Sequence, residues 1–135
     1  MPSVSDFFDS YREAFERFDV SAVADHFTFP LQVAGDSEPV DLRCVASRDE
    51  WLETLTMLID LYKGFGVTTA TVLESTVTTL SDRIAHAAMH WSLRDGSGQE
   101  IYDFNGVYTM VAVEGEFRVA AIAHDELGKI MAKLS

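Results

Sequence analysis

Apolar residues follow a helical spacing in the first half of the chain and alternate with polar ones in much of the second half. Residues 3–18 carry apolar side chains at the i, i+3, i+4 and i+7 positions of an amphipathic helix. Ser3 and Asp6 can form a capping box at its start, and Asp19 can cap a short second helix after it. A further capping box, SRDE at residues 47–50, opens the longest predicted helix, and the glycines of KGFG end it.

The extended segments make up the rest of the chain. Residues 29–35 and 40–46 predict a hairpin, and Pro30 predicts that its first strand lies at a sheet edge, because proline cannot donate to a hydrogen-bond ladder. The Thr- and Val-rich residues 67–80 predict a long strand with a bend near Glu74. Three more strands and a short C-terminal helix from Glu126 follow, which predicts one α+β domain over residues 1–135.

Residues 83–95, RIAHAAMHWSLRD, decide between a metal site and a strand. On a helix, His86 and His90 would share a face and could bind one ion. However, one side of this run is wholly apolar when its residues are taken alternately, which indicates a half-buried strand. The two imidazoles would then lie roughly 13 Å apart, so no metal site is predicted here.

The pairing of this strand with the next one suggests an acid–base pair. With the turn centred on residues 96–97, Trp91 lies opposite Tyr102 and His90 lies opposite Asp103. Side chains that face each other across two strands lie about 5 Å apart, so His90 and Asp103 can form a hydrogen bond. The carboxylate would orient the imidazole and raise its basicity.

The following hairpin places Asn105 opposite His124 and separates two faces of the sheet. An aromatic face collects Trp91, Tyr102, Phe104, Tyr108 and Phe117, and a polar face collects His86, His90, Asp103, Asn105 and His124. The helices are expected to cover the aromatic face, because it holds most of the apolar area. The polar face would be wet or packed on a second subunit, unless a bulge in the last strand turns part of it into a pocket.

Composition limits the partners. The net charge is −12 with only ten scattered Lys and Arg residues, which argues against nucleic acid and anionic membranes as partners. A single cysteine, Cys44, and an acidic N-terminal stretch without an apolar signal region lead us to expect a cytoplasmic protein. No apolar run is long enough to cross a bilayer, and there is no phosphate-binding Gly-rich loop and no CxxC or HExxH motif, so we expect no membrane span, cofactor or metal.

The order of the predicted elements resembles the nuclear transport factor 2-like superfamily, in particular its SnoaL-like (polyketide-cyclase-like) branch. The resemblance covers essentially the whole chain and is carried by FFDSYREAFERFDVSAVADHFTFP, SRDEWLETLTMLIDLYKGFG and YDFNGVYTMVAVEGEFRVAAIAHDE. It implies a cone-shaped α+β fold, with a curved mixed or antiparallel sheet whose concave face is covered by the N-terminal helices. It also implies a ligand pocket between them, for which the candidate residues are Tyr11, Phe15, Phe29, Trp51, Leu55, Tyr62, Trp91, Phe104, Asn105 and Tyr108.

The resemblance also tests catalytic templates. Isomerase-type members carry an aspartate base just before the proline of the first strand, where this chain has Phe29. Dehydratase-type members pair an aspartate, which Asp19 could match, with a histidine that the stretch GFGVTT lacks. Cyclase-like members place an acidic residue near the end of the last strand, which matches Asp125. Asp125 could act there as general acid or base, or could instead cap the C-terminal helix.

The sequence therefore predicts a SnoaL-like domain that binds a small hydrophobic molecule and forms a homodimer through the outer face of the sheet. If it is an enzyme, we expect cofactor-free acid–base chemistry of the isomerase, cyclase or dehydratase type on a hydrophobic carbonyl compound. The candidate catalytic residues are His90, Asp103, His124 and Asp125. The alternative is a non-catalytic binding or dimerisation module.

Overall fold

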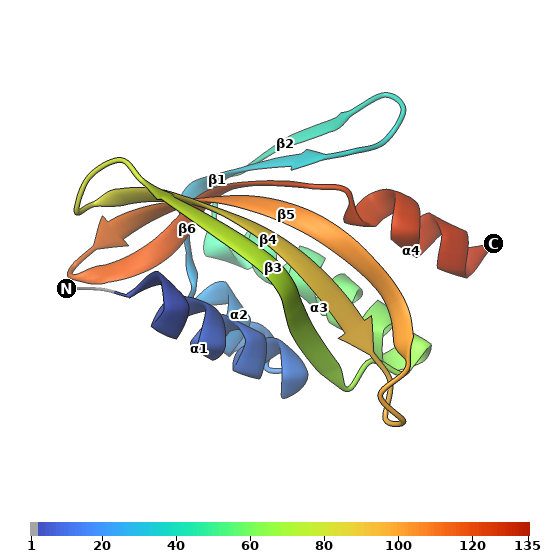
Figure 1. The fold of residues 1–135 in the computed structure, drawn as a ribbon. Coiled ribbons are helices and arrows are strands. Elements are labelled where there is room, and N and C mark those ends of the chain that lie inside the picture. The colour runs from blue at the N-terminus through green and yellow to red at the C-terminus, as the bar shows by residue number, and fades with distance from the viewer. Residues whose placement is uncertain (1–2) are drawn as a thin grey trace.

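A curved six-stranded sheet carries helices on its concave side (Figure 1). The computed structural model describes residues 3–135. The helices are α1 (Val4–Glu16), α2 (Val20–Ala24), α3 (Arg48–Phe65) and α4 (Glu126–Leu134). The strands are β1 (Phe27–Gly35), β2 (Asp41–Val45), β3 (Thr69–Thr79), β4 (Ile84–Arg94), β5 (Glu100–Val113) and β6 (Glu116–His124). Helices α1, α2 and α3 lie against the sheet, and α4 continues from the end of β6.

The predicted helix starts are confirmed by their capping hydrogen bonds. The Ser3 side chain accepts from the Asp6 amide at 3.2 Å, and the Asp19 side chain accepts from the Ala22 amide at 3.0 Å. Ser47 caps α3, where it accepts from the Glu50 amide at 3.3 Å. These contacts satisfy amides that a helix leaves without an internal partner, so the local sequence fixes where α1, α2 and α3 begin.

The sheet is mixed, with the strand order β2-β1-β6-β5-β4-β3. Strands β1 and β6 are parallel, and all the other neighbours are antiparallel. The predicted edge position of the first strand is wrong, because β1 lies between β2 and β6. Pro30 is tolerated there because the pairing of β1 with β6 shifts register between Phe27 and Gln32, and its pairing with β2 begins only at Leu31.

The register between β4 and β5 differs from the prediction by two residues. Trp91 lies opposite Phe104, and His90 lies opposite Asn105. The turn is longer than expected, because Oδ1 of Asp95 accepts hydrogen bonds from the backbone amides of residues 97 and 99. The pairing of β4 with β5 also shifts register between residues 93 and 94. A shift of two residues leaves each side chain on its predicted face, so the aromatic face still meets the helices.

Two bulges change the direction of side chains along the sheet. One lies between Val72 and Glu74 of β3 and confirms the bend predicted near Glu74. The other lies in β6 at Ala120, which has no partner on β5, because Val119 pairs with Met110 and Ala121 pairs with Thr109; it is a bulge in the last strand, the alternative that the sequence left open. Beyond it, His124 pairs with Gly106 and not with Asn105, so its side chain changes to the concave side.

The core lies between this concave face and the helices. Phe8 of α1 packs edge-on against Tyr108 of β5, with ring centroids 5.2 Å apart, and Phe27 packs in the same way on Trp51 of α3. Among residues 3–135, no helix is long and apolar enough to cross a membrane.

Candidate functional site

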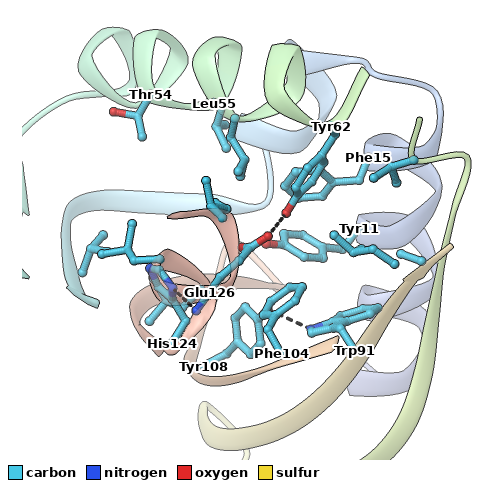
Figure 2. A pocket seen from close by; sticks show the side chains of 18 of the residues that line it. Tyr11, Phe15, Thr54, Leu55, Tyr62, Trp91, Phe104, Tyr108, His124 and Glu126 are labelled. Atoms are coloured by element: carbon cyan, nitrogen blue, oxygen red, sulfur yellow. Dashed lines mark hydrogen bonds between the residues drawn. The ribbon is translucent and has the colours of Figure 1, made fainter. Parts of the chain in front are cut away.

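A cavity of about 150 Å³ lies between the concave face of the sheet and helices α1, α3 and α4 (Figure 2). An engineered cavity of about this size in another protein binds a single benzene ring. Eight of the ten residues proposed for ligand contact line it: Tyr11, Phe15, Trp51, Leu55, Tyr62, Trp91, Phe104 and Tyr108. Their contact with a ligand stays a prediction.

The other two residues proposed for ligand contact lie elsewhere. Phe29 packs against the core in the stretch of β1 that has no register with β6. Asn105 is exposed on the opposite side of the sheet, where it contacts Asp125. Neither residue lines the cavity. The pairing of β1 with β6 shifts register around Phe29, and Asn105 follows the inward-facing Phe104 in the strand, so its side chain points to the other side.

The first residue of α4, Glu126, places a buried carboxyl group in the cavity wall. Glu126 is only 6% exposed, and its Oε2 accepts hydrogen bonds from the hydroxyls of Tyr62 and of Tyr102, the latter at 2.8 Å. Burial raises the pKa of Glu126 to about 7, although the two tyrosine hydrogen bonds act in the opposite direction. The carboxyl group can therefore release or take up a proton near neutral pH.

The second oxygen of this carboxyl group is available to a ligand. Oε1 of Glu126 makes no hydrogen bond with any of residues 3–135, whereas Oε2 accepts two. Figure 2 shows the Glu126 side chain reaching from α4 toward Tyr62, between His124 and the rings of the cavity. The tyrosines thus fix one oxygen and leave the other free to react.

Neutral hydroxyl groups surround the carboxyl group. Burial raises the pKa of Tyr11, Tyr62, Tyr102 and Tyr108, so these phenols stay protonated at neutral pH. The indole Nε1 of Trp91 donates to the Tyr108 hydroxyl at 3.0 Å and holds that ring in place.

His124 lies next to Glu126 in the cavity wall and keeps one ring nitrogen available as a hydrogen-bond donor. Its Nδ1 accepts from the backbone amide of Glu126 at 3.1 Å, so the proton of the neutral ring is on Nε2. Burial lowers the pKa of His124, against the opposing charges of Asp125 and Asp41. Among the four proposed catalytic residues, His124 is the one that lines the cavity.

Asp125 points to the other side of the sheet. Its Oδ1 accepts from the Asn105 backbone amide at 2.7 Å, and its Oδ2 accepts from the Asn105 side chain at 3.2 Å. Asp125 occupies the N-cap position of α4, as the alternative interpretation of this residue expected, but its carboxylate makes no capping hydrogen bond to the helix. The bonds to Asn105 use the oxygens that a cap would need.

The predicted hydrogen bond between His90 and Asp103 is present, but it lies on the outer face of the sheet. We use "outer face" for the side of the sheet opposite α1, α2 and α3, which includes His86, Ala88, His90, Asp103, Asn105 and Val107. His90 Nε2 donates to Asp103 Oδ2 at 2.7 Å, and Lys129 Nζ lies 3.6 Å from Asp103 Oδ1. The hydrogen bond from His90 and the charge of Lys129 lower the pKa of Asp103. The sheet separates this pair from the cavity, and the catalytic roles of all four residues stay predictions.

Sequence reasoning missed Glu126, although a signal for it was present. In HDE, residues 124–126, Glu126 follows His124 by two positions and Asp125 by one. If the strand is extrapolated from the sequence through these three residues, alternation puts residues 124 and 126 on one side and residue 125 on the other. In the structure the strand ends at His124 and Glu126 begins α4, but Asp125 still points away from the cavity. Once His124 is turned inward, the same spacing selects Glu126. In the described chain, residues 3–135, no group of three or more His, Cys, Asp or Glu residues is placed to hold a metal ion.

Comparisons with known proteins agree on the fold. A family model described as NTF2-like protein (DUF6841) matches residues 2–127, and no curated protein matches the sequence. An NTF2-like protein of unknown function from Shewanella oneidensis is 14% identical with a TM-score of 0.70, covering 90% of this chain and 95% of its own. A Xanthomonas campestris chain provisionally named a calcium/calmodulin-dependent protein kinase II association domain is 18% identical with a TM-score of 0.65, over 90% and 84% of the two chains. A Novosphingobium aromaticivorans chain provisionally named an aromatic ring hydroxylase is 13% identical with a TM-score of 0.67, over 90% and 85%.

Proposed function

The chain belongs to the NTF2-like protein (DUF6841) family, and from this premise we propose that it binds a small, mostly apolar carbonyl compound in its cavity and exchanges protons with it through Glu126. The observation that carries the proposal is a buried carboxyl group with one free oxygen in an aromatic cavity. If Glu126 only anchored the two tyrosine hydroxyls, a glutamine at this position would accept the same hydrogen bonds without the cost of burying a charge.

The proton transfer follows from the two groups that the cavity presents. Ionised Glu126 removes a proton from the carbon next to the carbonyl, and the electron pair of that C–H bond moves to form an enolate. The Nε2–H of His124 donates a hydrogen bond to the enolate oxygen, which is favourable because the ring is neutral and cannot lose its proton easily. Protonated Glu126 then returns the proton to carbon, at the original or at a neighbouring position.

The size and composition of the cavity support a ligand of one ring. Its volume of about 150 Å³ matches a single aromatic ring, and its walls are mainly aromatic and aliphatic. The provisional name of the Novosphingobium relative also refers to an aromatic ring.

Deuterium exchange tests the proton transfer without knowledge of the natural substrate. Phenylacetone in D₂O loses its α-proton NMR signals as exchange proceeds, and we expect the protein to accelerate this loss. Glu126→Gln should reduce the catalysed rate by at least about 100-fold, the usual contribution of a general base. The rate should rise with pH through about 7, because the ionised form of Glu126 is the base.

His90→Ala is the matched control, because His90 belongs to the acid–base pair on the outer face. It should leave the exchange rate unchanged. Loss of exchange in His90→Ala with retention in Glu126→Gln would instead place the chemistry at the outer pair. If phenylacetone binds without faster exchange, the non-catalytic binding module is correct.

A second proposal concerns the outer face, which we propose docks a second copy of the chain. Val107 is 46% exposed there, with Ala88 and Ala123 as its neighbours on the adjacent strands. These small side chains continue into a shallow hollow of about 320 Å³ beside β1 and β2. The small apolar side chains around Val107 form a surface that is suited to pack against its own symmetry mate. The provisional name of the Xanthomonas relative refers to association as well.

A further inference from the structure

Two arginines line the cavity, and their surroundings differ. Arg12 of α1 is neutralised by Glu16, with Nη1 and Oε1 3.1 Å apart. Arg43 of β2 has no carboxylate within 4.0 Å among residues 3–135, and its one hydrogen bond runs from Nη2 to Oγ1 of Thr54 on α3 at 3.0 Å. In a chain with 22 acidic residues, an unpaired guanidinium at a cavity is a feature to explain.

The sheet register directs Arg43 to the cavity side. Arg43, which is exposed, pairs with Val33 of β1; Val33 pairs with Ile122 of β6, and Ile122 pairs with the inward-facing Tyr108 of β5. Arg43, Val33 and Ile122 line the cavity and also border the shallow hollow beside β1 and β2. The adjacent row runs from Asp41 through Gly35 to His124. We call Asp41, Arg43, Thr54 and His124 the cavity rim.

The rim offers hydrogen-bond donors that lack an acceptor. Arg43 uses one of its five N–H bonds on Thr54, and the Thr54 hydroxyl still has its own hydrogen to donate. The Nε2–H of His124 is also without a partner among residues 3–135. Asp41 lies on the same face of β2 as Arg43, two residues away, and forms no ion pair with it within 4.0 Å.

From this juxtaposition we infer that the carbonyl compound bound in the cavity also carries a carboxylate, which binds Arg43 and Thr54 at the rim while its apolar ring fills the interior. The inference rests on the proposed function and narrows its substrate class to a one-ring acid. A planar guanidinium matches a planar carboxylate through two parallel hydrogen bonds. A phosphate is disfavoured, because its second negative charge would face Asp41 in a chain of net charge −12.

A pair of probes of the same shape tests the inference. We would measure the dissociation constants of 3-phenylpropanoate and of its neutral counterpart 3-phenylpropanamide by ligand titration in NMR, at low salt. The wild-type protein should bind the carboxylate at least about tenfold more tightly, as a charge-assisted pair provides. Arg43→Met should abolish this preference and leave the affinity for the amide within about twofold, since the ring contacts are unchanged.

Arg48→Met is the matched control. It removes the same charge from the molecule, but Arg48 pairs with Asp25 at 2.8 Å and does not line the cavity. The preference for the carboxylate should survive in this variant. If it disappears in Arg48→Met as well, the effect is one of net charge and the inference is overturned.

The remaining outcomes separate this inference from the function on which it rests. Equal binding of both probes to the wild-type protein would overturn the carboxylate inference and leave the cavity as a binding site for neutral molecules. Absence of binding by either probe up to its solubility would contradict the cavity as a ligand site for one-ring compounds, and with it both proposals.

Discussion

At the scale of the residue, the burial of Glu126 works against folding. The pKa of this carboxyl group is about 7 in the folded protein and 4.5 in the unfolded chain. Between these two pH values the folded state therefore binds more protons than the unfolded state. Below pH 4.5 both states are protonated, and the group costs nothing. Above pH 7 the native state must hold a buried anion, so stability is lost as the pH rises through this window. Tyr62 and Tyr102 offset only part of that cost.

The first prediction follows from this sign. Glu126→Gln keeps an oxygen to accept the two tyrosine hydrogen bonds but cannot ionise. Its free energy of unfolding relative to the wild-type protein should rise by about 3 kcal/mol between pH 4.5 and pH 8, from a pKa difference of 7 against 4.5. Urea denaturation at both pH values measures this change, and the titration of His124 largely cancels because both proteins contain it. A difference that does not depend on pH would show that Glu126 is not protonated in the folded protein near neutrality.

At the scale of the element, the caps and the alternation along β4 were readable from the sequence, whereas the register was not. A capping box acts over three residues and an alternating strand over two, so both leave a local pattern. The register of β4 against β5 depends on hydrogen bonds from the Asp95 side chain into its own turn, which lengthen it. The direction of His124 depends on a bulge at Ala120 of β6, where no proline or glycine marks it. Local sequence patterns therefore could not predict on which face of the sheet the candidate site lies.

The second prediction concerns the way α4 is seated. Gly35 of β1 lies between Asp41 and His124, and a Cβ at this position would overlap Cδ1 of Leu127 in the first turn of α4. Gly35→Ala should therefore destabilise the protein by about 1–2 kcal/mol by forcing Leu127 to move. In a Leu127→Ala background the same change should cost much less, because the overlap is gone.

Urea denaturation of the four proteins in this double-mutant cycle measures the coupling between the two positions. Hydrogen exchange should report faster opening of α4 in the single variant Gly35→Ala, since this helix carries Glu126 into the cavity. An equal cost of Gly35→Ala in both backgrounds would mean that α4 is not seated through this contact.

At the scale of the whole molecule, the sheet separates two groups of polar residues that the sequence analysis assigned to one face: the His90–Asp103 pair on the outer face and His124 at the cavity. The predicted polar face held His86, His90, Asp103, Asn105 and His124 in one group, and the bulge in β6 moves His124 through to the cavity side. The α+β fold itself was predictable, because its signals are repeated over every element and no single error alters the order of elements. The site was less predictable than the fold, because it depends on which side of β6 the His124 side chain occupies. What remains on the outer face is a set of small and polar groups around Val107.

The last prediction tests what this outer face does. If two copies pack there, Val107→Arg places a charge in the middle of an apolar contact and should convert a dimer into a monomer in sedimentation velocity. Val77→Arg is the matched control, because Val77 of β3 is 44% exposed, close to the 46% of Val107, but pairs with the buried Ala87 on the helix side of the sheet. It should leave the dimer intact. Neither variant should change the exchange of phenylacetone, because the cavity lies on the other side of the sheet from Val107 and its lining does not include Val77. A wild-type protein that sediments as a monomer at about 100 μM, well above the micromolar range in which specific interfaces form, would refute the dimer and leave the cavity chemistry to stand alone.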